Sequence, residues 1–353
     1  MTEETFFKII KKGREIQASD VHLLVGEIPI LRVNGNLIKI ENYSSLSEEE
    51  MEEMLNFILD KEGKNKLELE REIDLSLKDK DGNCRLNIFY EKNKLSIVIR
   101  IVKNRIPTLK ELNINEKIYD FLDSKQGLLI IAGKSGSGKS TTIASIIEEI
   151  NKNKACNILT IEDPIEYIFE NKESIIRQRE IGEDVTDFSS GIKSSLRQDT
   201  DIIMVGELRD LESIEMAIVG AETGHLVIST LHTTGAIDTI DRIVSMFSNE
   251  KKEFIQRILS TNLIGVIYQE FIENITQDKK TKVPLCEMMY VNKGISNLIR
   301  TGRTNQISSF IEVSGRKGIL NKKECLKSLY RNDKINNKTY EEYLRKIRRE
   351  ETL

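Results

Sequence analysis

The pattern of hydrophobic and polar residues changes after about the first third of the chain, from short alternating runs to longer apolar runs separated by helical segments. The first part has short runs of period two, typical of half-buried strands, at 20–25, 29–40 and 84–102. Within 29–40, Asn34-Gly35 has the turn chemistry of a β-hairpin. A helix is expected over 45–59, since Ser47 followed by Glu50 forms the signature of a capping box.

From about residue 115 the pattern changes to apolar strands separated by helical segments, which is typical of a parallel sheet covered on both faces. Strands are expected at 127–132, 157–164, 175–182, 201–207 and 225–232. Helices are expected at 140–150, 187–199 and 210–224. After about residue 250 the chain is expected to be mainly helical, and Thr339 with Glu342 predicts a capping box for the last helix.

These patterns predict an α/β protein with two domains, which agrees with a prior of roughly 150 residues per domain for a chain of 353 residues. We assign 1–102 to a smaller N-terminal α+β domain. The α/β domain is assigned to 115–353, of which about 250–353 forms the mainly helical region. Residues 103–114 contain Pro107 and show no clear period, so we interpret them as the linker.

The strongest chemical signal is a glycine-rich stretch between an apolar strand and a helix. It consists of Gly133, Lys134, Ser135, Gly136, Ser137, Gly138, Lys139 and Ser140, followed by Thr141, and fits the pattern G-x-x-x-x-G-K-[ST]. In such a loop, backbone N–H groups surround a phosphate and the lysine neutralises it. The alternative is a flexible turn before an ordinary helix, but the strand before the loop and the apolar helix face after it favour a nucleotide-binding loop.

Carboxylates stand at the ends of two other expected strands. Glu207 ends the strand 201–207, where a phosphate-loop ATPase places the acid that holds Mg²⁺ or its water ligands. The alternative is a glutamate that faces solvent. Glu162, Asp163 and Glu166 follow another strand, where a carboxylate could orient or deprotonate the attacking water. A solvated acidic turn is equally compatible with these three residues.

Two histidines, His225 and His232, flank the apolar residues 226–231. Because their positions differ by seven, an odd number, their side chains would face opposite sides of a strand, which does not favour a shared metal ion. His232 is the better candidate to sense a γ-phosphate, since open α/β sheets bind ligands at the carboxyl ends of their strands. The four cysteines form no C-x-x-C pair, which argues against zinc and against disulfides.

Composition narrows the choice of partners and of compartment. The net charge of −4 gives no support for nucleic acid or an acidic membrane surface as the main partner. The apolar runs are far shorter than the roughly 20 residues of a membrane span, and the N-terminus lacks the apolar core of a secretory signal. We therefore expect a cytoplasmic protein.

In this order, the segments resemble the secretion-type ATPases, and most closely the PilT-type ATPases that retract type IV pili. The matching segments are 18–35, the phosphate loop 133–142, the acidic box 158–167, the stretch 194–213 with its Gly-Glu-x-Arg-Asp block, the histidine box 223–243 and the retraction-like motif 294–307. The resemblance implies a PAS-like N-terminal domain, a RecA-like P-loop ATPase domain and a homohexameric ring that uses ATP and Mg²⁺. Ser296 departs from the arginine that is usual in the last motif.

By this resemblance, the site residues fall into three groups. Those that would bind phosphates and Mg²⁺ are Lys139, Ser140 and Glu207. The catalytic base would be Glu166, accompanied by the histidine-box residues His225 and His232. The arginines would be Arg85 and Arg100 from the small domain, and Arg197 and Arg209 from the ATPase domain. An arginine supplied at the transition state increases the rate by about 10³–10⁵.

The resemblance predicts a hexameric motor, peripherally bound to the inner face of the cell membrane at the pilus base, that powers pilus retraction and twitching motility. Its expected partner is an inner-membrane platform protein, and other pilus ATPases are further candidates. The first alternative is a pilus-assembly or type II secretion ATPase, although those enzymes usually have a longer N-terminal region and a four-cysteine zinc insertion. The alternatives from other classes are a small-molecule kinase and a nucleotide-gated scaffold without turnover.

Overall fold

The computed structural model describes residues 2–33, 35–79, 82–102, 105–276, 279–313 and 319–350. The chain divides into two compact units, residues 1–105 and 106–353. The expected linker, 103–114, begins with two residues outside the described ones. Arg105 belongs to the first unit, and residues 106–114 belong to the second, where Leu109 and Ile114 are buried.

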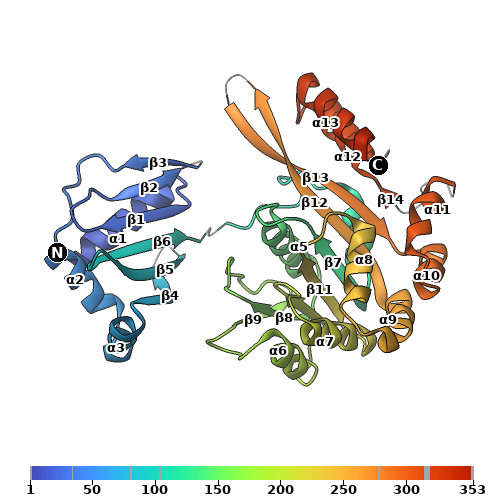
Figure 1. Cartoon of the computed structure of the whole chain (residues 1–353), viewed down its shortest axis with the longest axis horizontal. Helices are drawn as coiled ribbons and strands as arrows, with labels where there is room; N and C mark the ends of the chain where they lie inside the picture. Colours follow the sequence, from blue (N-terminus) through green and yellow to red (C-terminus); the bar gives the residue numbers. More distant parts are fainter. Residues whose placement is uncertain are drawn as a thin grey trace. The chain divides into compact units, whose positions relative to one another are not determined.

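The first unit is built around a six-stranded antiparallel sheet with strand order β3-β2-β1-β6-β5-β4 (Figure 1). Its strands are β1 (Asp20–Leu24), β2 (Ile30–Val33), β3 (Asn36–Lys39), β4 (Glu72–Asp79), β5 (Gly82–Glu91) and β6 (Lys94–Ile101). The three expected strand regions are confirmed, and β4 was not predicted. β2 and β3 pair as an antiparallel hairpin, but Asn34 of its expected turn lies outside the described residues.

Two helices, α1 (Thr2–Glu15) and α2 (Glu48–Ile58), pack against this sheet. Their shared core includes Phe6 and Met51 from the helices and Val21 and Leu23 from β1, all fully buried. The capping box of α2 is confirmed: the Ser47 side chain accepts from the Glu50 amide at 3.1 Å, and the Glu50 carboxylate accepts from the Ser47 amide at 2.8 Å. Neither α1 nor the third helix, α3 (Lys61–Glu70), was predicted.

The second unit contains an eight-stranded sheet with strand order β14-β13-β12-β7-β11-β10-β8-β9. β12, β7, β11, β10, β8 and β9, in this order along the sheet, are parallel to one another. β13 is antiparallel to β12, and β14 is antiparallel to β13. Their bounds are β7 (Gly127–Ala132), β8 (Asn157–Glu162), β9 (Ile175–Glu180), β10 (Ile202–Val205), β11 (Leu226–Leu231), β12 (Leu263–Thr276), β13 (Lys279–Tyr290) and β14 (Ile319–Leu320). The predicted α/β class and the five expected strands are confirmed.

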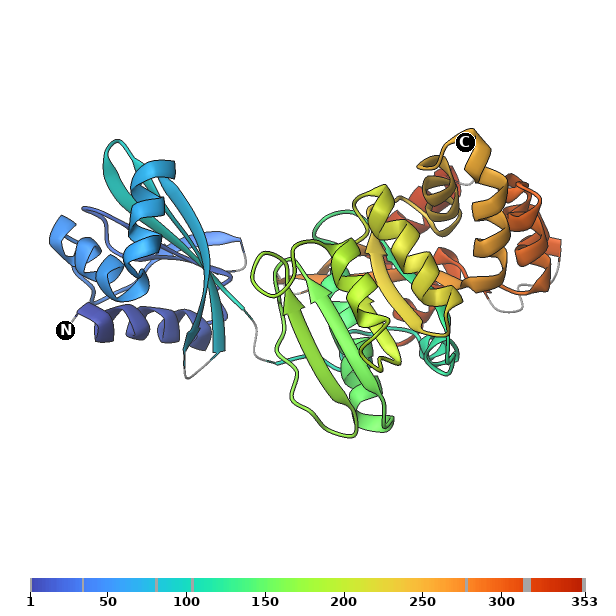
Figure 2. The same cartoon turned by 90° about the horizontal axis from the view of Figure 1, so that it is seen from below.

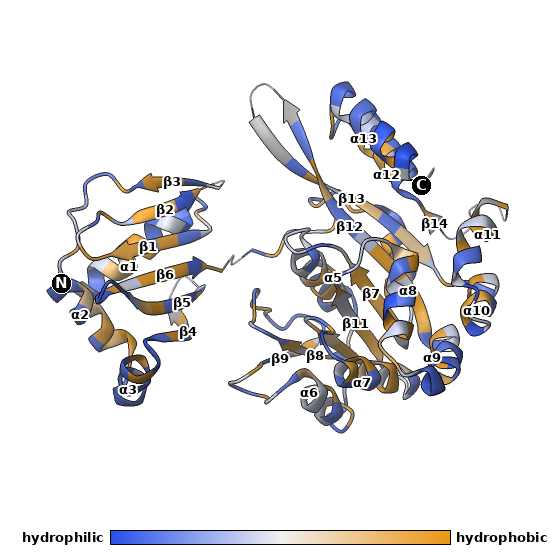
Figure 3. Cartoon of the chain, in the orientation of Figure 1, coloured by the Kyte–Doolittle hydropathy of each residue, from blue (hydrophilic) through white to orange (hydrophobic). Residues whose placement is uncertain are grey.

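Helices cover both faces of this sheet (Figures 1 and 2). One face carries α6 (Phe188–Ser195), α7 (Leu211–Glu222), α8 (Ala236–Ser245), α9 (Asn249–Asn262), α10 (Lys293–Arg300) and α11 (Ile307–Val313). The other carries α4 (Tyr119–Leu122), α5 (Lys139–Asn153), α12 (Lys322–Arg331) and α13 (Asn337–Glu350). Apolar residues concentrate along the central strands, whereas α12 and α13 are largely polar (Figure 3).

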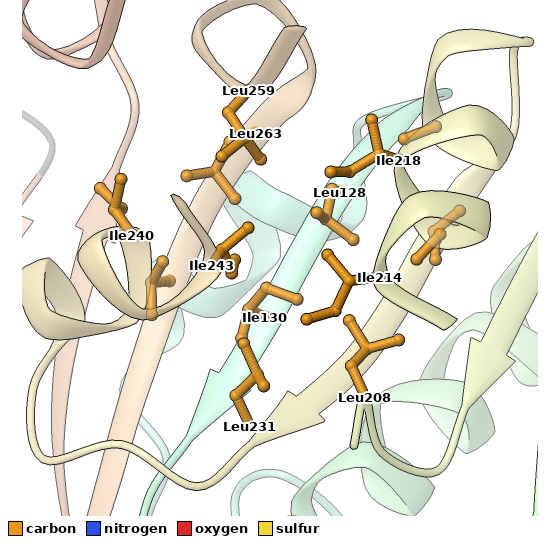
Figure 4. Close-up of a cluster of buried hydrophobic side chains, with 14 of the residues drawn as sticks. Leu128, Ile130, Leu208, Ile214, Ile218, Leu231, Ile240, Ile243, Leu259 and Leu263 are labelled. Atoms are coloured by element: carbon orange, nitrogen blue, oxygen red, sulfur yellow. The ribbon is translucent and has the colours of Figure 1, made fainter. Parts of the chain in front are cut away.

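The central strand β7 supplies side chains to both cores. Leu128 and Ile130 belong to the core under α7 and α8 (Figure 4), whereas Leu129 and Ile131 belong to the core under α5. Successive strand residues point to opposite faces, so an unbroken apolar run is needed where both faces are covered. Full burial of each such side chain contributes about 1.5–3 kcal/mol.

The expectation of a mainly helical region after about residue 250 is wrong for β12 and β13. These strands form a long antiparallel hairpin, orange in Figure 1, whose first strand also pairs in parallel with β7. β12 is thus hydrogen-bonded on one edge to β13, the next strand in the chain, and on the other to β7, more than a hundred residues earlier. The pairing with β7 joins segments that are far apart in the chain, so no local pattern in the sequence reveals it.

The expected capping box at Thr339 and Glu342 is also wrong, because α13 begins earlier. Asn336 occupies the capping position, since its side-chain oxygen accepts from the Thr339 amide at 2.8 Å. The Thr339 hydroxyl instead donates to Asn274 of β12 at 3.3 Å. The final helix is therefore fixed at its start to the long hairpin.

The first half of the retraction-like motif 294–307 lies on α10. Asn292 caps it by accepting from two backbone amides, and Ile295 and Ile299 are fully buried. Gly302 follows the helix with φ +68°, a left-handed conformation that favours glycine at a helix end. Among the described residues, no helix combines the length and apolar content that a membrane span requires.

Candidate functional site

The glycine-rich loop connects the buried end of β7 to the first turn of α5. Gly136 and Gly138 have φ values of +74° and +86°, which residues other than glycine rarely adopt. At Gly133, an added Cβ would lie 2.3 Å from the backbone oxygen of Gln269. Gly138 is the N-cap of α5 and offers no side chain to the first helical amides, which leaves them suited to bind an anion.

Lys139 lies inside the concave side of this loop. Its side chain is 7% exposed, and Nζ donates to the carbonyl oxygens of Gly133 at 2.8 Å and Lys134 at 3.1 Å. Burial lowers the pKa of Lys139, while the charge of Glu166 acts in the opposite direction. The ammonium group is thus held by carbonyl oxygens of the loop itself.

A cleft of about 400 Å³ opens beside the loop, at the carboxyl ends of β7, β8, β10 and β11. It is lined by Ser135, Gly136, Gly138, Lys139, Ser140, Thr141, Ile143, Ala144, Glu162, Asp163, Pro164, Glu166, Tyr167, Phe169, Phe188, Met204, Gly206, Glu207, Arg209, Thr230 and His232. This edge is where open α/β sheets bind ligands.

Glu207 is the centre of a charged cluster in this cleft. Its carboxylate pairs with Arg209 and lies 3.2 Å from Nε2 of His232. Arg209 also contacts Asp163 at 3.2 Å and so links the ends of β8 and β10. Burial, and then the charges of Lys139 and Arg209, lower the pKa of His232, which favours the neutral ring.

Glu162 is a buried carboxylic acid at the end of β8. Its Oε1 accepts from the Thr160 hydroxyl at 2.7 Å and from the Gln178 amide at 3.1 Å. Burial raises its pKa from 4.5 to about 7, and these hydrogen bonds oppose the shift only in part. The sequence did not distinguish Glu162 from Asp163 and Glu166 as the buried carboxylate. Its burial depends on the packing of β9, which is distant in the local pattern.

The sequence-predicted residues are only partly brought together. The cleft is lined by Lys139, Ser140, Thr141, Glu166, Glu207, Arg209 and His232, together with the loop residues Ser135, Gly136 and Gly138. Gly133, Lys134 and Ser137 belong to the loop but do not line the cleft.

Two predicted residues lie away from the cleft. His225 is at the opposite end of β11 from His232, and its Nδ1 contacts Gly220 at 3.1 Å and Thr223 at 3.2 Å near the end of α7. Arg197 is exposed after α6, and its guanidinium donates to the Lys193 carbonyl at 3.4 Å. Within one chain, neither residue contributes to the cleft.

The small-domain arginines lie side by side on the sheet of the first unit. Arg85 and Arg100 are directly paired across β5 and β6, and Arg100 pairs in turn with Asp20 on β1. Nε of Arg100 lies 3.3 Å from the Asp20 carboxylate, with 72% of the arginine side chain exposed. This face of the sheet therefore presents positive charge to its surroundings.

Several lining residues were not singled out from the sequence. Tyr167 is the clearest case, since its hydroxyl lies 2.9 Å from that of Thr141 and connects the acidic box to α5. Phe169 and Phe188 contribute apolar lining. Aromatic residues after a Pro-containing turn carry no signature of their own, so only the fold reveals their position.

Known proteins with the same architecture identify the family. Residues 3–352 match the family described as "Type II/IV secretion system protein". The chain belongs to this family. It is 38% identical over 313 residues to the "Type IV pilus retractation ATPase PilT" of Pseudomonas aeruginosa, covering 88% of this chain and 90% of that protein. It is 36% identical to a "Twitching motility protein" of Neisseria gonorrhoeae, covering 86% of this chain and 80% of the relative.

A solved structure of a member of this family is similar over almost the whole chain. The crystal structure of the pilus retraction motor PilT with bound ADP superposes with a TM-score of 0.86 at 37% identity, covering 95% of each chain. The predicted resemblance to the secretion-type ATPases is therefore confirmed, and the chain is an ATPase.

The substitution Glu162→Gln should remove a pH-dependent part of the stability. Because the pKa is raised from 4.5 to about 7 in the folded state, this group favours folding fully below about pH 4.5. That contribution is lost as the pH rises through about 7, and amounts to about 3 kcal/mol at most, from about 1.4 kcal/mol per pH unit. The amide oxygen can still accept from Thr160 and Gln178.

The measurement is urea unfolding of the nucleotide-free protein between pH 5 and pH 8. The free energy of unfolding of the wild type should fall more steeply over this range than that of Glu162→Gln. Parallel curves for the two proteins would show that Glu162 does not titrate in this window.

Proposed function

We propose that the chain is the subunit of an ATP-hydrolysing motor that retracts type IV pili and drives twitching motility. The observation that carries the proposal is that Lys139, Glu166 and Glu207 line a single cleft at the edge of a parallel sheet. The family, and the printed names of relatives that span most of the chain, support the retraction role.

The loop and the first turn of α5 would bind the phosphates of ATP. Lys139 and the amides after Gly136 would hold the outer phosphates by charge-assisted hydrogen bonds. Ser140 and Glu207, which line the same cleft, offer a hydroxyl and a carboxylate, the oxygen donors that Mg²⁺ prefers. The donor set therefore fits the metal, which would neutralise charge that develops on the phosphate oxygens.

Glu166 is proposed as the base that orients or deprotonates the attacking water. It lines the cleft close enough for its charge to act on the Lys139 ammonium. Glu207 already pairs with Arg209 and His232, which makes it less available as a proton acceptor. The lowered pKa of His232 favours its neutral ring. Its hydrogen bond to Glu207 would make the position of the His232 ring depend on what the Glu207 carboxylate binds.

A homohexamer is proposed because the cleft has few cations of its own. Among its described lining residues, the cations are Lys139 and Arg209, and Arg209 is already paired with two carboxylates. Arg85 and Arg100 of a neighbouring copy would supply the missing positive charge. Arg197 and His225, which lie outside the cleft of their own chain, are candidates for the contact between copies.

The motor would act at the inner face of the cell membrane at the pilus base, on an inner-membrane platform protein and beside other pilus ATPases. A pilus-assembly or type II secretion ATPase is the alternative within the family. Deletion of the gene distinguishes retraction from pilus assembly. Loss of a retraction motor leaves cells with an excess of pili and without twitching. Loss of an assembly motor leaves them without pili.

Substitutions of the two candidate acids should separate binding from hydrolysis. Glu166→Gln and Glu207→Gln keep the side-chain shape but lose charge and basicity, so ATP should still bind while turnover falls about 10²- to 10⁴-fold. Lys139→Ala should instead weaken binding itself. The exposed control Glu222→Gln, on α7, should leave turnover unchanged. The measurements are phosphate release and nucleotide binding. Full turnover in Glu166→Gln with loss in Glu207→Gln would move the base role to Glu207.

Coupling between subunits should appear when variant and wild-type chains are mixed. If neighbours complete each site and act in sequence, Lys139→Ala subunits should reduce the ATPase rate by more than their fraction in the mixture. Lys327→Ala, an exposed lysine of α12, is the matched control and should produce no loss. A strictly linear decrease with Lys139→Ala would contradict coupled subunits.

Arg300 tests whether α10 transmits motion to the pilus machinery. Its side chain is exposed and donates to Asn297 at 2.8 Å, so Arg300→Ala should change stability by less than about 0.5 kcal/mol. ATP turnover should also persist, while twitching of cells that carry the variant should be lost. Ile299→Ala is the packing control: it removes a fully buried side chain and should cost about 2–5 kcal/mol. Normal twitching with Arg300→Ala would show that Arg300 is not the residue through which this segment transmits motion.

A further inference from the structure

Gln269, on β12, is a polar side chain in an apolar part of the second unit. It is 2% exposed, and both ends of its carboxamide are hydrogen-bonded. Nε2 donates to the Ser137 carbonyl at 2.7 Å, and Oε1 accepts from the Thr142 hydroxyl at 2.7 Å. Ser137 belongs to the glycine-rich loop and Thr142 to the first turn of α5, so one amide joins the two parts that would hold the phosphates.

The backbone of β12 also shapes the loop from outside. An added Cβ at Gly133 would lie 2.3 Å from the backbone oxygen of Gln269. One at Gly138 would lie 2.7 Å from Phe271 Cζ and 3.0 Å from Nε2 of Gln269. The loop is therefore in van der Waals contact with β12 at two of its glycines, and cannot shift towards that strand.

The hydrogen bond to Ser137 determines which way one peptide group faces. In a trans peptide the C=O of one residue and the N–H of the next point in opposite directions. Since the Ser137 carbonyl points at Gln269, the N–H of Gly138 points away from β12. Gly138 lines the cleft and Ser137 does not, which places that N–H on the side of the cleft.

We propose that Gln269 is a positioning residue for nucleotide binding, which holds the Ser137–Gly138 peptide with its N–H directed at the phosphates. The inference rests on the proposed function, since it assumes that the cleft binds ATP. Glutamine suits the place because it carries a donor for the Ser137 carbonyl and an acceptor for the Thr142 hydroxyl on one rigid group. Glutamate would present an acceptor to a carbonyl oxygen, and methionine would present no donor.

The test is a comparison of KM and kcat for ATP in the full-length protein, with ADP affinity measured directly by calorimetry. Gln269→Met and Gln269→Glu should raise KM for ATP and the Kd for ADP by roughly 10- to 100-fold, the effect of misdirecting a buried peptide group. The value of kcat should stay within a few-fold, as expected when an interaction is equally strong in the ground and transition states. Thr142→Val, which removes the bond on the acceptor side alone, should have a smaller effect in the same direction.

The control is Cys286→Ala: the buried Cys286 thiol makes a long contact of 4.0 Å with the Gln269 oxygen, which already accepts from the Thr142 hydroxyl at 2.7 Å. It should leave KM unchanged. Reduced thermal stability of the Gln269 variants with unchanged KM and Kd would overturn the proposal and leave Gln269 a packing residue. If the substitutions at Gln269 prevent folding, an unchanged KM in Thr142→Val would overturn it. Absence of ATP binding by the wild type would instead contradict the proposed function.

Discussion

The site depends on where β7 ends, and pairing on both edges together with packing on both faces fixes that point. β7 is hydrogen-bonded to β11 on one edge and to β12 on the other, and all six of its residues are buried. Its alternate side chains fill the cores on the two faces of the sheet. The strand cannot slide by one residue without exchanging these two sets, so the register of the glycine-rich loop is set by the packing of the whole unit.

The position of the other site residues follows from the same parallel sheet. β8, β10 and β11 run in the direction of β7, so the residues that follow them reach the same edge. Glu166, Glu207 and His232 come from three segments separated in sequence and still line one cleft. His225 comes just before β11 and therefore lies at the far edge, where it contacts the end of α7 instead. The two histidines are thus separated by the length of β11, since one precedes the strand and the other follows it.

The features that could be predicted from the sequence are those whose cause is local. The capping box of Ser47 and Glu50, the glycine-rich loop and the apolar run of β7 are each determined by residues close together in the chain. The long β12–β13 hairpin was missed because its conformation is set by pairing with β7, more than a hundred residues earlier in the sequence. The buried state of Glu162 and the contacts of Gln269 likewise arise only when distant strands meet.

The charge of the cleft gives a physical reason for a motor to need neighbouring subunits. Asp163, Glu166 and Glu207 line it, while Arg209 is already engaged by two of them and Lys139 is held by carbonyl oxygens of its own loop. A polyphosphate entering this cleft meets more negative than free positive charge, so binding and hydrolysis would require cations from outside the chain. If those cations are Arg85 and Arg100 of another copy, hydrolysis would proceed only when that copy is correctly placed. ATP hydrolysis would then be coupled to the movement of subunits relative to one another, because both depend on bringing these arginines to the phosphates.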